Sequence, residues 1–300
     1  MQKEANRLLA VINPVSGGSD KKSHVRQLKK TCAKQSTEYY SFTTTGENDT
    51  MKLADVFDNI LPEIVVVFGG DGTLNMVATA LIDEEYTCAL IPMGSANGLA
   101  TELCINTPEE ALDLVFQGKL IYMDMLKIND EYCLHFSDIG FNAELVKRYE
   151  KGALRGQMGY AKYLIEVLFS RVIFQCEFPD SISLDRNKKT KMVAIANARR
   201  FGSGAFINPK GAVNDGTFEL VVVQQYPWYQ FFRLSYLMFN GRLDELDFVK
   251  IFPVRQVRIK VNEKVPLQID GESKGNVGEV LEATISSKKL KILVPQDGDY

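Results

Sequence analysis

The feature that most constrains the fold is a buried strand that leads directly into a glycine-rich turn. Residues 64–68 (IVVVF) form a continuous apolar run, typical of a strand covered on both faces in a parallel sheet. Residues 69–75 (GGDGTLN) then place three glycines within four positions, with Asp71 between them. Glycines let backbone N–H groups approach an anion, and a helix start adds a favourable dipole. A turn without a ligand would explain the glycines but not the carboxylate, so we predict a phosphate-binding turn.

Two further loops carry glycine and short polar side chains where strands are expected to end. Residues 13–18 (NPVSGG) follow an apolar run at 8–12, and residues 92–98 (PMGSANG) follow one at 88–91. Either loop alone would be an ordinary turn as readily as a binding loop. Three together favour a polyphosphate site lined by backbone N–H groups. None matches GxxxxGK[ST] or GxGxxG, which argues against a P-loop NTPase and a Rossmann oxidoreductase.

The periodicity of the sequence changes near residue 125, where we expect a domain boundary. Residues 1–125 alternate strand and helix patterns, which predicts an α/β domain with a parallel sheet. The expected strands there are 8–12, 37–42, 64–68 and 88–91, and the expected helices are 21–33, 50–60, 74–81 and 96–103.

Residues 126–286 read as a mostly antiparallel, β-rich domain that carries a few helices. A hairpin is expected from a strand at 119–128 and a strand at 131–138, joined around Asn129 and Asp130. Further strands are expected at 181–184, 192–197, 217–223, 256–261, 266–269 and 279–286, and helices at 143–149 and 158–170.

The composition narrows the classes of partner and compartment. Three hundred residues suit two domains, and a formal net charge of −3 argues against nucleic acid as the main partner. Five cysteines stand singly, with no CxxC pair, which favours a reducing cytoplasm over a disulfide or zinc framework. The chain has no apolar run of membrane-spanning length and no signal-peptide pattern, so any membrane contact is expected to be peripheral and transient.

Carboxylates occur in two glycine turns of the second domain. Residues 214–219 (NDGTFE) would alone be an ordinary turn before a strand, whereas residues 268–272 (QIDGE) place two carboxylates around a glycine. A carboxylate beside a phosphate site can accept a hydroxyl proton or hold Mg²⁺.

Two other segments have a structural and a functional interpretation. Residues 226–239 contain the only tryptophan and seven aromatic residues in fourteen. They fit a membrane-contacting helix, but apolar residues on both faces favour a helix buried against the β-rich domain. Arg155 lies in a basic, glycine-containing stretch that could reach a phosphate, although a solvated helix face is the favoured interpretation.

Taken in chain order, NPVSGG, GGDGTLN, GSANGLA, NDGTFEL and DGE resemble the motifs of the diacylglycerol kinase catalytic-domain family, which includes sphingosine and ceramide kinases. The resemblance runs from about residue 8 to residue 295. GGDGT alone is shared with NAD kinases and 6-phosphofructokinases. The resemblance implies a Rossmann-like α/β nucleotide domain, a β-rich antiparallel sandwich domain that binds lipid, a cleft between them, and a segment, 287–300, that returns to the first domain.

The resemblance also implies roles for individual residues. Asp71 and Glu272 would be the catalytic pair, without a choice between them as general base. Asp215, with carbonyl groups near Ala212 and Thr217, would hold a structural Mg²⁺. Glu144 would contact the lipid substrate. The residues expected to bind ATP are Asn13, Pro14, Val15, Ser16, Gly17, Thr44 (or a neighbouring threonine), Gly69, Gly70, Asp71, Gly72, Thr73, Leu74, Asn75 and Ser95.

Three positions depart from the family pattern: Met76, Gly98 and Asn142 stand where acidic residues are usual. The sequence therefore predicts a cytoplasmic, ATP- and Mg²⁺-dependent kinase that phosphorylates a lipid hydroxyl, on diacylglycerol or a sphingoid base for example. The alternatives are an NAD kinase and a non-catalytic nucleotide-binding protein. The sequence allows a homodimer but does not determine the oligomeric state.

Overall fold

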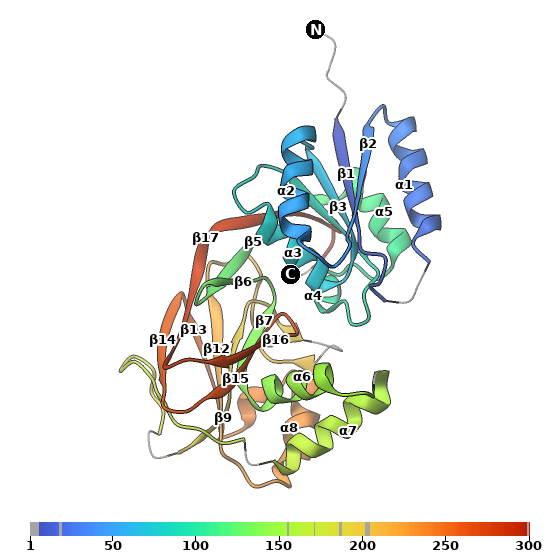
Figure 1. Ribbon diagram of the computed structural model, residues 1–300. Coiled ribbons are helices and arrows are strands. Elements are labelled where there is room, and N and C mark those ends of the chain that lie inside the picture. The colour runs from blue at the N-terminus through green and yellow to red at the C-terminus, as the bar shows by residue number, and fades with distance from the viewer. Residues whose placement is uncertain are drawn as a thin grey trace. The chain divides into compact units, whose positions relative to one another are not determined.

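The computed structural model describes residues 6–17, 20–154, 156–170, 172–185, 188–201, 205–298 and 300. The chain divides into two compact units (Figure 1). The first unit comprises residues 1–124 and 287–300, and the second comprises residues 125–286. Among the described residues, no helix is long and apolar enough to cross a membrane.

The first unit is a parallel sheet with helices on its faces. Its strands lie in the order β2-β1-β3-β4-β17, and each neighbouring pair is parallel. Helices α1 and α5 pack together, as do α2 and α3, and the two pairs lie on opposite sides of the sheet (Figure 1). The elements are β1 (Arg7–Ile12), α1 (Lys22–Lys34), β2 (Glu38–Thr43), α2 (Asp49–Ile60), β3 (Ile64–Gly69), α3 (Asp71–Ala80), β4 (Thr87–Pro92), α4 (Gly98–Glu102), α5 (Pro108–Gln117), the first part of β5 (Lys119–Ile128) and the last part of β17 (Val280–Val294).

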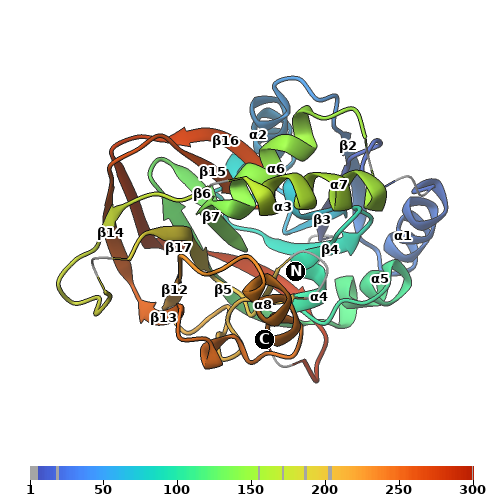
Figure 2. The same ribbon diagram turned by 90° about the horizontal axis from the view of Figure 1, so that it is seen from below.

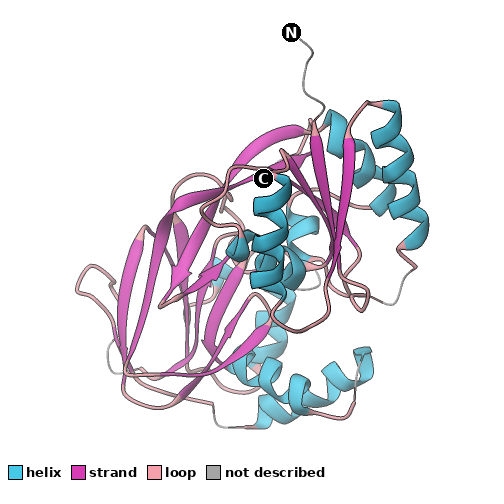
Figure 3. Cartoon of the chain, turned by 45° about the horizontal axis from the view of Figure 1, so that its top comes forward, coloured by secondary structure: helices cyan, strands magenta, loops and turns pink. Residues whose placement is uncertain are grey.

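The second unit is built around two sheets, and its strands dominate the view in Figure 3. One sheet is antiparallel, in the order β13-β12-β9-β7-β15-β16. The other holds β8, β14 and the parts of β17, β5 and β6 within this unit. The elements not yet given are β6 (Glu131–Cys133), β7 (Phe136–Gly140), α6 (Phe141–Lys151), α7 (Gly156–Phe169), β8 (Cys176–Glu177), β9 (Thr190–Ala196), β10 (Arg200–Phe201), β11 (Ala205–Phe206), β12 (Phe218–Gln224), α8 (Gln230–Phe239), the 3₁₀ turn η1 (Leu243–Glu245), β13 (Val249–Val254), β14 (Gln256–Val261), β15 (Val265–Ile269) and β16 (Glu272–Val277).

The largest core of the second unit lies between its two sheets. Leu126, Ile259 and Leu281 come from one sheet, and Val193 and Leu220 come from the other; all five side chains are buried in one cluster. Burial of apolar side chains from both sheets makes the second unit a β sandwich. The predicted fold class, an α/β domain followed by an antiparallel sandwich, is confirmed.

Several predicted elements were wrong in detail. Residues 181–184 form no strand: Ile182 and Leu184 pack onto the sandwich core without joining a ladder, so their alternation reflects packing alone. The strand expected at 131–138 is two strands, β6 and β7, in different sheets. Helix α5 was not predicted, although Thr107 accepts a hydrogen bond from the Glu110 N–H (3.2 Å) and thus caps its start.

Candidate functional site

The three glycine loops of the first unit converge at the carboxyl ends of β1, β3 and β4. Gly17 has φ +55°, and a Cβ built there would lie 2.2 Å from the carbonyl oxygen of Met93. A Cβ on Gly94 would lie 2.6 Å from the Cα of Gly70. Both approaches leave no room for a side chain, which explains why glycine occupies these positions. The convergence expected from the sequence is confirmed.

Hydrogen bonds hold the loops in this arrangement. The Asn13 side-chain amide donates to the Thr73 hydroxyl (2.9 Å), which joins the first loop to the second. The Met93 N–H donates to the Gly69 carbonyl (2.8 Å), which joins the third loop to the second. Thr44, predicted at the edge of the site, is buried directly after β2 and donates its N–H to Ile12 (2.9 Å).

Asp71 is fixed by the third loop. Its carboxylate oxygens accept hydrogen bonds from the N–H groups of Gly98 (2.7 Å) and Leu99 (3.1 Å), at the start of α4. A carboxylate oxygen can accept more than one bond, so each oxygen keeps capacity for a cation. Asp71 therefore braces two loops and still offers oxygen donors, the ligands that Mg²⁺ prefers.

Helix α3 begins at Asp71, three residues before the start expected from the sequence. Consequently the N–H groups of Thr73 and Leu74 donate to the carbonyl of Gly70 (3.0 and 3.1 Å), and the Leu74 side chain is fully buried. The N–H groups of Asp71 and Gly72 lie at the very start of the helix, where backbone donors have no partner within it. An anion would be bound by these earlier groups.

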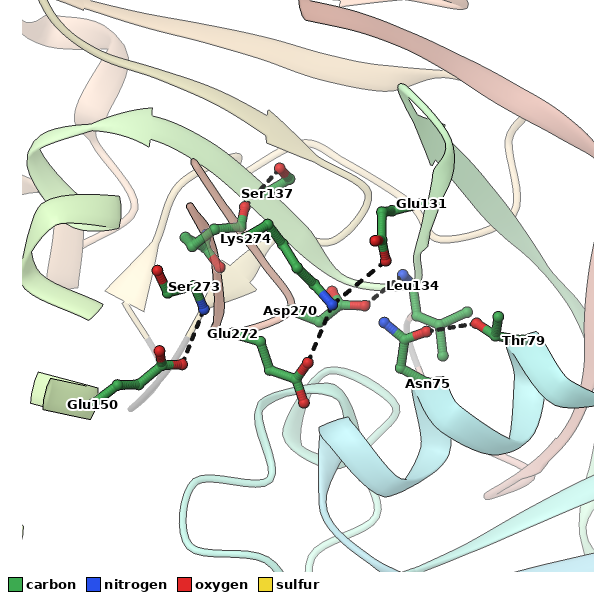
Figure 4. A network of polar contacts seen from close by, with 11 residues as sticks. Asn75, Thr79, Glu131, Leu134, Ser137, Glu150, Asp270, Glu272, Ser273 and Lys274 are labelled. Atoms are coloured by element: carbon green, nitrogen blue, oxygen red, sulfur yellow. Dashed lines mark hydrogen bonds and ion pairs between the residues drawn. The ribbon is translucent and has the colours of Figure 1, made fainter. Parts of the chain in front are cut away.

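The remaining predicted nucleotide residues lie around these loops. Val15 is 87% exposed, Pro14 and Ser95 are also exposed, and the Ser16 hydroxyl donates to the Asn13 carbonyl (3.2 Å). The Asn75 side-chain oxygen accepts from the Thr79 hydroxyl along α3 (3.0 Å; Figure 4). Asn97 was not predicted: its side chain closes the third loop by bonding both the N–H (2.8 Å) and the carbonyl (3.0 Å) of Gly94.

In the second unit, Asp270 anchors the turn that carries Glu272. Its carboxylate accepts hydrogen bonds from three successive N–H groups, those of Leu134 (2.8 Å; Figure 4), His135 (2.9 Å) and Phe136 (3.0 Å). Because these N–H groups donate to Asp270, the chain between β6 and β7 does not continue as a paired strand. These bonds are the physical reason that the strand expected at 131–138 is interrupted.

Glu272 itself is exposed, with Lys274 3.3 Å from its carboxylate. Lys274 also pairs with Glu131 (3.4 Å), and the two ion pairs are drawn in Figure 4. Partial burial by itself would lower the pKa of Lys274, but attraction to Glu272 and Glu131 raises it. The ammonium thus stays charged between two carboxylates.

A buried carboxylate that the sequence did not reveal lies beneath this turn. Asp138 is fully buried and accepts hydrogen bonds from Asn142 (2.6 Å), the Ala143 N–H (2.8 Å) and the Gln268 amide (2.5 Å). Burial raises its pKa to about 6, although the hydrogen bonds oppose the rise. The Gln268 oxygen in turn accepts the Gly271 N–H (2.8 Å). One amide therefore connects the start of α6 to the Glu272 turn.

Glu144, the predicted substrate contact, lies on α6 close to the cations of its own helix. Arg148 Nε is 2.7 Å and Lys147 Nζ is 3.8 Å from its carboxylate. Its negative charge is already balanced locally. Arg155, whose phosphate role was considered from the sequence, lies outside the described residues.

The predicted structural metal site lies in a turn before β12. Asp215 is exposed, and one of its oxygens accepts both the N–H and the hydroxyl of Thr217 (2.8 Å each). Burial, and then repulsion from Asp215, raises the pKa of Glu219 to about 7. No group of three or more His, Cys, Asp or Glu side chains that could enclose a metal occurs in the described part of the chain. The Asp215 carboxylate supplies oxygen donors of the kind that a hydrated Mg²⁺ prefers.

Comparison with known proteins identifies the family. Residues 7–128 match the diacylglycerol kinase catalytic domain, and residues 139–294 match the YegS C-terminal NAD kinase beta sandwich-like domain. The chain belongs to the diacylglycerol kinase catalytic-domain family. It is a member of a lipid kinase family, which implies use of ATP and a lipid substrate.

Individual relatives of this family are distant. The chain is 25% identical over 276 residues to the diacylglycerol kinase of Bacillus subtilis, covering 90% of each chain. It is 27% identical over 223 residues to the "Probable lipid kinase YegS-like" of Pectobacterium atrosepticum, covering 72% of this chain and 73% of that protein. A diacylglycerol kinase crystal structure from Bacillus anthracis has the same fold, with a TM-score of 0.72, 16% identity and coverage of 98% and 99%.

Proposed function

We propose that the chain transfers the γ-phosphoryl group of ATP to a hydroxyl of diacylglycerol. The observation that supports this most strongly is the close contact between three glycine loops at one sheet edge, where Gly17, Gly70 and Gly94 let the loop backbones approach one another. Backbone N–H groups of loops gathered in this way, beside the start of a helix, suit a polyphosphate. The loop residues predicted for ATP are proposed to hold the nucleotide there, mainly through backbone groups.

The proposed roles of the two carboxylates differ because their environments differ. Asp71 already accepts two backbone N–H groups, which fix its carboxylate within the loops and leave it able to hold a cation. Glu272 is exposed and accepts no backbone N–H bond within the described structure. We therefore assign the metal-facing role to Asp71 and the acceptance of the hydroxyl proton to Glu272. Mg²⁺, when bound, would neutralise charge on the transferring phosphates.

Diacylglycerol is preferred over a sphingoid base because of Glu144. A protonated amine on the acceptor would call for an available carboxylate, whereas Glu144 is paired with Arg148 at 2.7 Å. The Bacillus subtilis relative, which covers 90% of this chain, is named a diacylglycerol kinase. Both observations favour a neutral acceptor.

The test is transfer of label from γ-labelled ATP, with Mg²⁺, to dispersed diacylglycerol, sphingosine, ceramide, phosphatidylglycerol and, separately, NAD. Label in diacylglycerol is expected. Label in NAD alone would establish the NAD kinase alternative. Glu272→Gln should lower the rate at least about 10²-fold. Glu131→Gln is the matched control, since it breaks an ion pair to the same Lys274 but leaves the proposed base in place.

A structural cation at Asp215 is proposed on separate grounds. Repulsion between Asp215 and Glu219 would be relieved by a divalent ion, whose ligands would include Asp215 and the carbonyls of Ala212 and Thr217. We expect EDTA to lower the melting temperature and Mg²⁺ to restore it. Asp215→Asn should abolish that response; a melting temperature that EDTA leaves unchanged would exclude the site.

A further inference from the structure

One face of α8 and of the turn before it is unusually aromatic and exposed. Phe231, Leu234 and Met238 pack onto the core cluster that includes Val221, so only one side of the helix is buried. The opposite side exposes Trp228 (59%), Tyr229 (58%), Phe232 (65%), Tyr236 (63%) and Phe239 (55%). The segment was expected to be buried against the β-rich domain; α8 does pack there, but with one side only. We call these five exposed residues the aromatic face.

The spacing of the aromatic face produces a continuous stripe. Phe232, Tyr236 and Phe239 recur every three or four positions of α8, so their side chains lie on one side of the helix, and Trp228 and Tyr229 stand in the turn just before it. An exposed apolar surface of this kind in a folded protein usually marks a binding surface. Tryptophan and tyrosine, with one polar atom on an apolar ring, are the residues enriched at the boundary between lipid and water.

The charges around the aromatic face suit a phospholipid surface. Between residues 226 and 241 the only charged side chain is Arg233, which is exposed and has no partner among the described residues. The first carboxylates beyond the helix are already paired: Asp244 with Lys210 (3.7 Å) and Glu245 with Arg242 (2.6 Å). A segment whose only charge is a cation complements the phosphate layer of a membrane.

We propose that the aromatic face docks the protein on a phospholipid bilayer. This inference extends the proposed function, because a kinase whose acceptor is a membrane lipid must reach the bilayer. Helix α7 lies at the same end of the second unit (Figures 1 and 2) and also exposes Met158 (84%) and Ile165 (58%). Helix α7 therefore adds exposed apolar side chains to this unit beyond those of α8.

A second copy of the chain fits the aromatic face less well than a bilayer. Five aromatic side chains that each expose about three fifths of roughly 200 Å² offer about 600 Å². Stable protein interfaces bury about 800 Å² on each partner. A membrane needs no such minimum, since partial insertion of a few aromatic rings suffices for reversible binding.

The chain contains its own reporter, because Trp228 is its only tryptophan. Fluorescence of the full-length protein is recorded with vesicles of phosphatidylcholine, and of phosphatidylcholine with phosphatidylglycerol, in the absence of ATP and diacylglycerol. We expect a blue shift that saturates with lipid and quenching by lipids brominated on the acyl chain. No shift with either vesicle would overturn the proposal. A blue shift on concentrating the protein without vesicles would assign the face to self-association instead.

Variants separate the contributions of the aromatic side chains and of the Arg233 charge to vesicle binding. Phe232→Ser with Tyr236→Ser should weaken vesicle binding at least about tenfold. Arg233→Gln should weaken binding to phosphatidylglycerol-containing vesicles about fivefold and leave phosphatidylcholine binding nearly unchanged. Tyr40→Ser with Tyr122→Ser is the control, because these two tyrosines are also exposed but lie in the first unit. Equal binding by the control and the Phe232/Tyr236 variant would contradict docking through α8.

Failure of docking and failure of the proposed function give different results. Phosphoryl transfer is measured with diacylglycerol in detergent micelles, where bilayer docking is not needed. The Phe232/Tyr236 variant should keep its micelle activity and lose activity on vesicles. If the protein bound vesicles but phosphorylated no lipid, the docking proposal would stand and the proposed function would be refuted. If it phosphorylated diacylglycerol in micelles but bound no vesicles, the proposed function would stand and docking would be refuted.

Discussion

The aspartate–glycine turns at Asp71 and Asp270 are built in opposite ways. Asp71 accepts N–H groups 27 and 28 residues further along the chain, within a group of loops that already touch through glycine backbones. Asp270 accepts N–H groups 134 to 136 residues earlier, with its side chain bridging to a separate strand connection. The first turn is packed closely because its glycines carry no side chains. The second turn is held by a side chain, that of Asp270, which bonds to a distant part of the chain. The first is therefore visible in the sequence, and the second is not.

The largest expected effect tests whether Asp71 is more than a brace. Asp71→Asn keeps one acceptor oxygen but sets an amide NH₂ against the other backbone N–H, so a loss of about 1–3 kcal/mol of stability is expected, with the protein still folded. Phosphoryl transfer should nevertheless fall about 10²- to 10⁴-fold, because the charge that faces the metal is lost. Steady-state rates and melting curves are measured together. If the variant lost stability but kept its turnover, Asp71 would be a structural residue like Asp270.

The matched control for this variant is Asp49→Asn. Asp49 also accepts backbone N–H groups, from Thr45 (2.9 Å) and Gly46 (2.7 Å), in the same unit. The substitution removes a comparable charge outside the glycine loops. Its transfer rate should equal that of the unmodified protein.

A second test compares a glycine of the loops that surround Asp71 with the glycine of the Asp270 turn. Gly17 and Gly271 both have left-handed backbones, with φ +55° and +84°. A Cβ on Gly17 would meet the Met93 carbonyl, whereas a Cβ on Gly271 would meet nothing within 4 Å. Gly271→Ala should cost about 1–2 kcal/mol of stability from backbone strain alone, and Gly17→Ala about 2–5 kcal/mol because overpacking is added. Urea denaturation measures both. Equal losses would show that the loops do not touch as described.

The sequence predicted the first unit well because its information is local. A buried strand followed by glycines predicts both the turn and the sheet edge, and β1, β3 and β4 all end in such loops. The sequence does not indicate which distant residues a side chain will contact. Nothing local indicates that Asp270 would meet residues 134–136, or that Gln268 would connect Asp138 to Gly271. Nor did an apolar pattern on both sides of α8 reveal which side the sandwich would cover.

The two units should also respond to pH in opposite directions. In the first unit, backbone hydrogen bonds hold the pKa of Asp49 below its ordinary value, so its contribution to stability is lost as the pH falls. In the second unit, burial raises the pKa of Asp138 from 3.8 to about 6. Its contribution is present below pH 3.8 and is lost as the pH rises through 6, at a cost of up to about 3 kcal/mol.

The substitution Asp138→Asn isolates the contribution of this carboxyl group to the pH dependence of stability. The variant loses an acceptor for its three donors and should be less stable at every pH. Its deficit relative to the unmodified protein should shrink as the pH rises from 4 to 7, because only the unmodified protein must ionise a buried carboxyl. Free energies of unfolding in urea at each pH give the difference. A deficit independent of pH would mean that Asp138 is not buried in the charged state.

The smallest expected effect concerns the brace of the second turn. Asp270→Asn replaces one acceptor oxygen with an amide that cannot accept the N–H groups of the connection between β6 and β7. Hydrogen bonds to a charged group contribute about 1.5–3 kcal/mol, so a loss of about 2 kcal/mol is expected. Glu272→Gln is the control on the same turn, and its exposed side chain should change stability by less than about 0.5 kcal/mol. Pairing of Ile269 with Ser137 places β15 beside β7 in any case. If Asp270→Asn were as stable as the control, that pairing alone would position Glu272, and the second turn would depend on its backbone as much as the first.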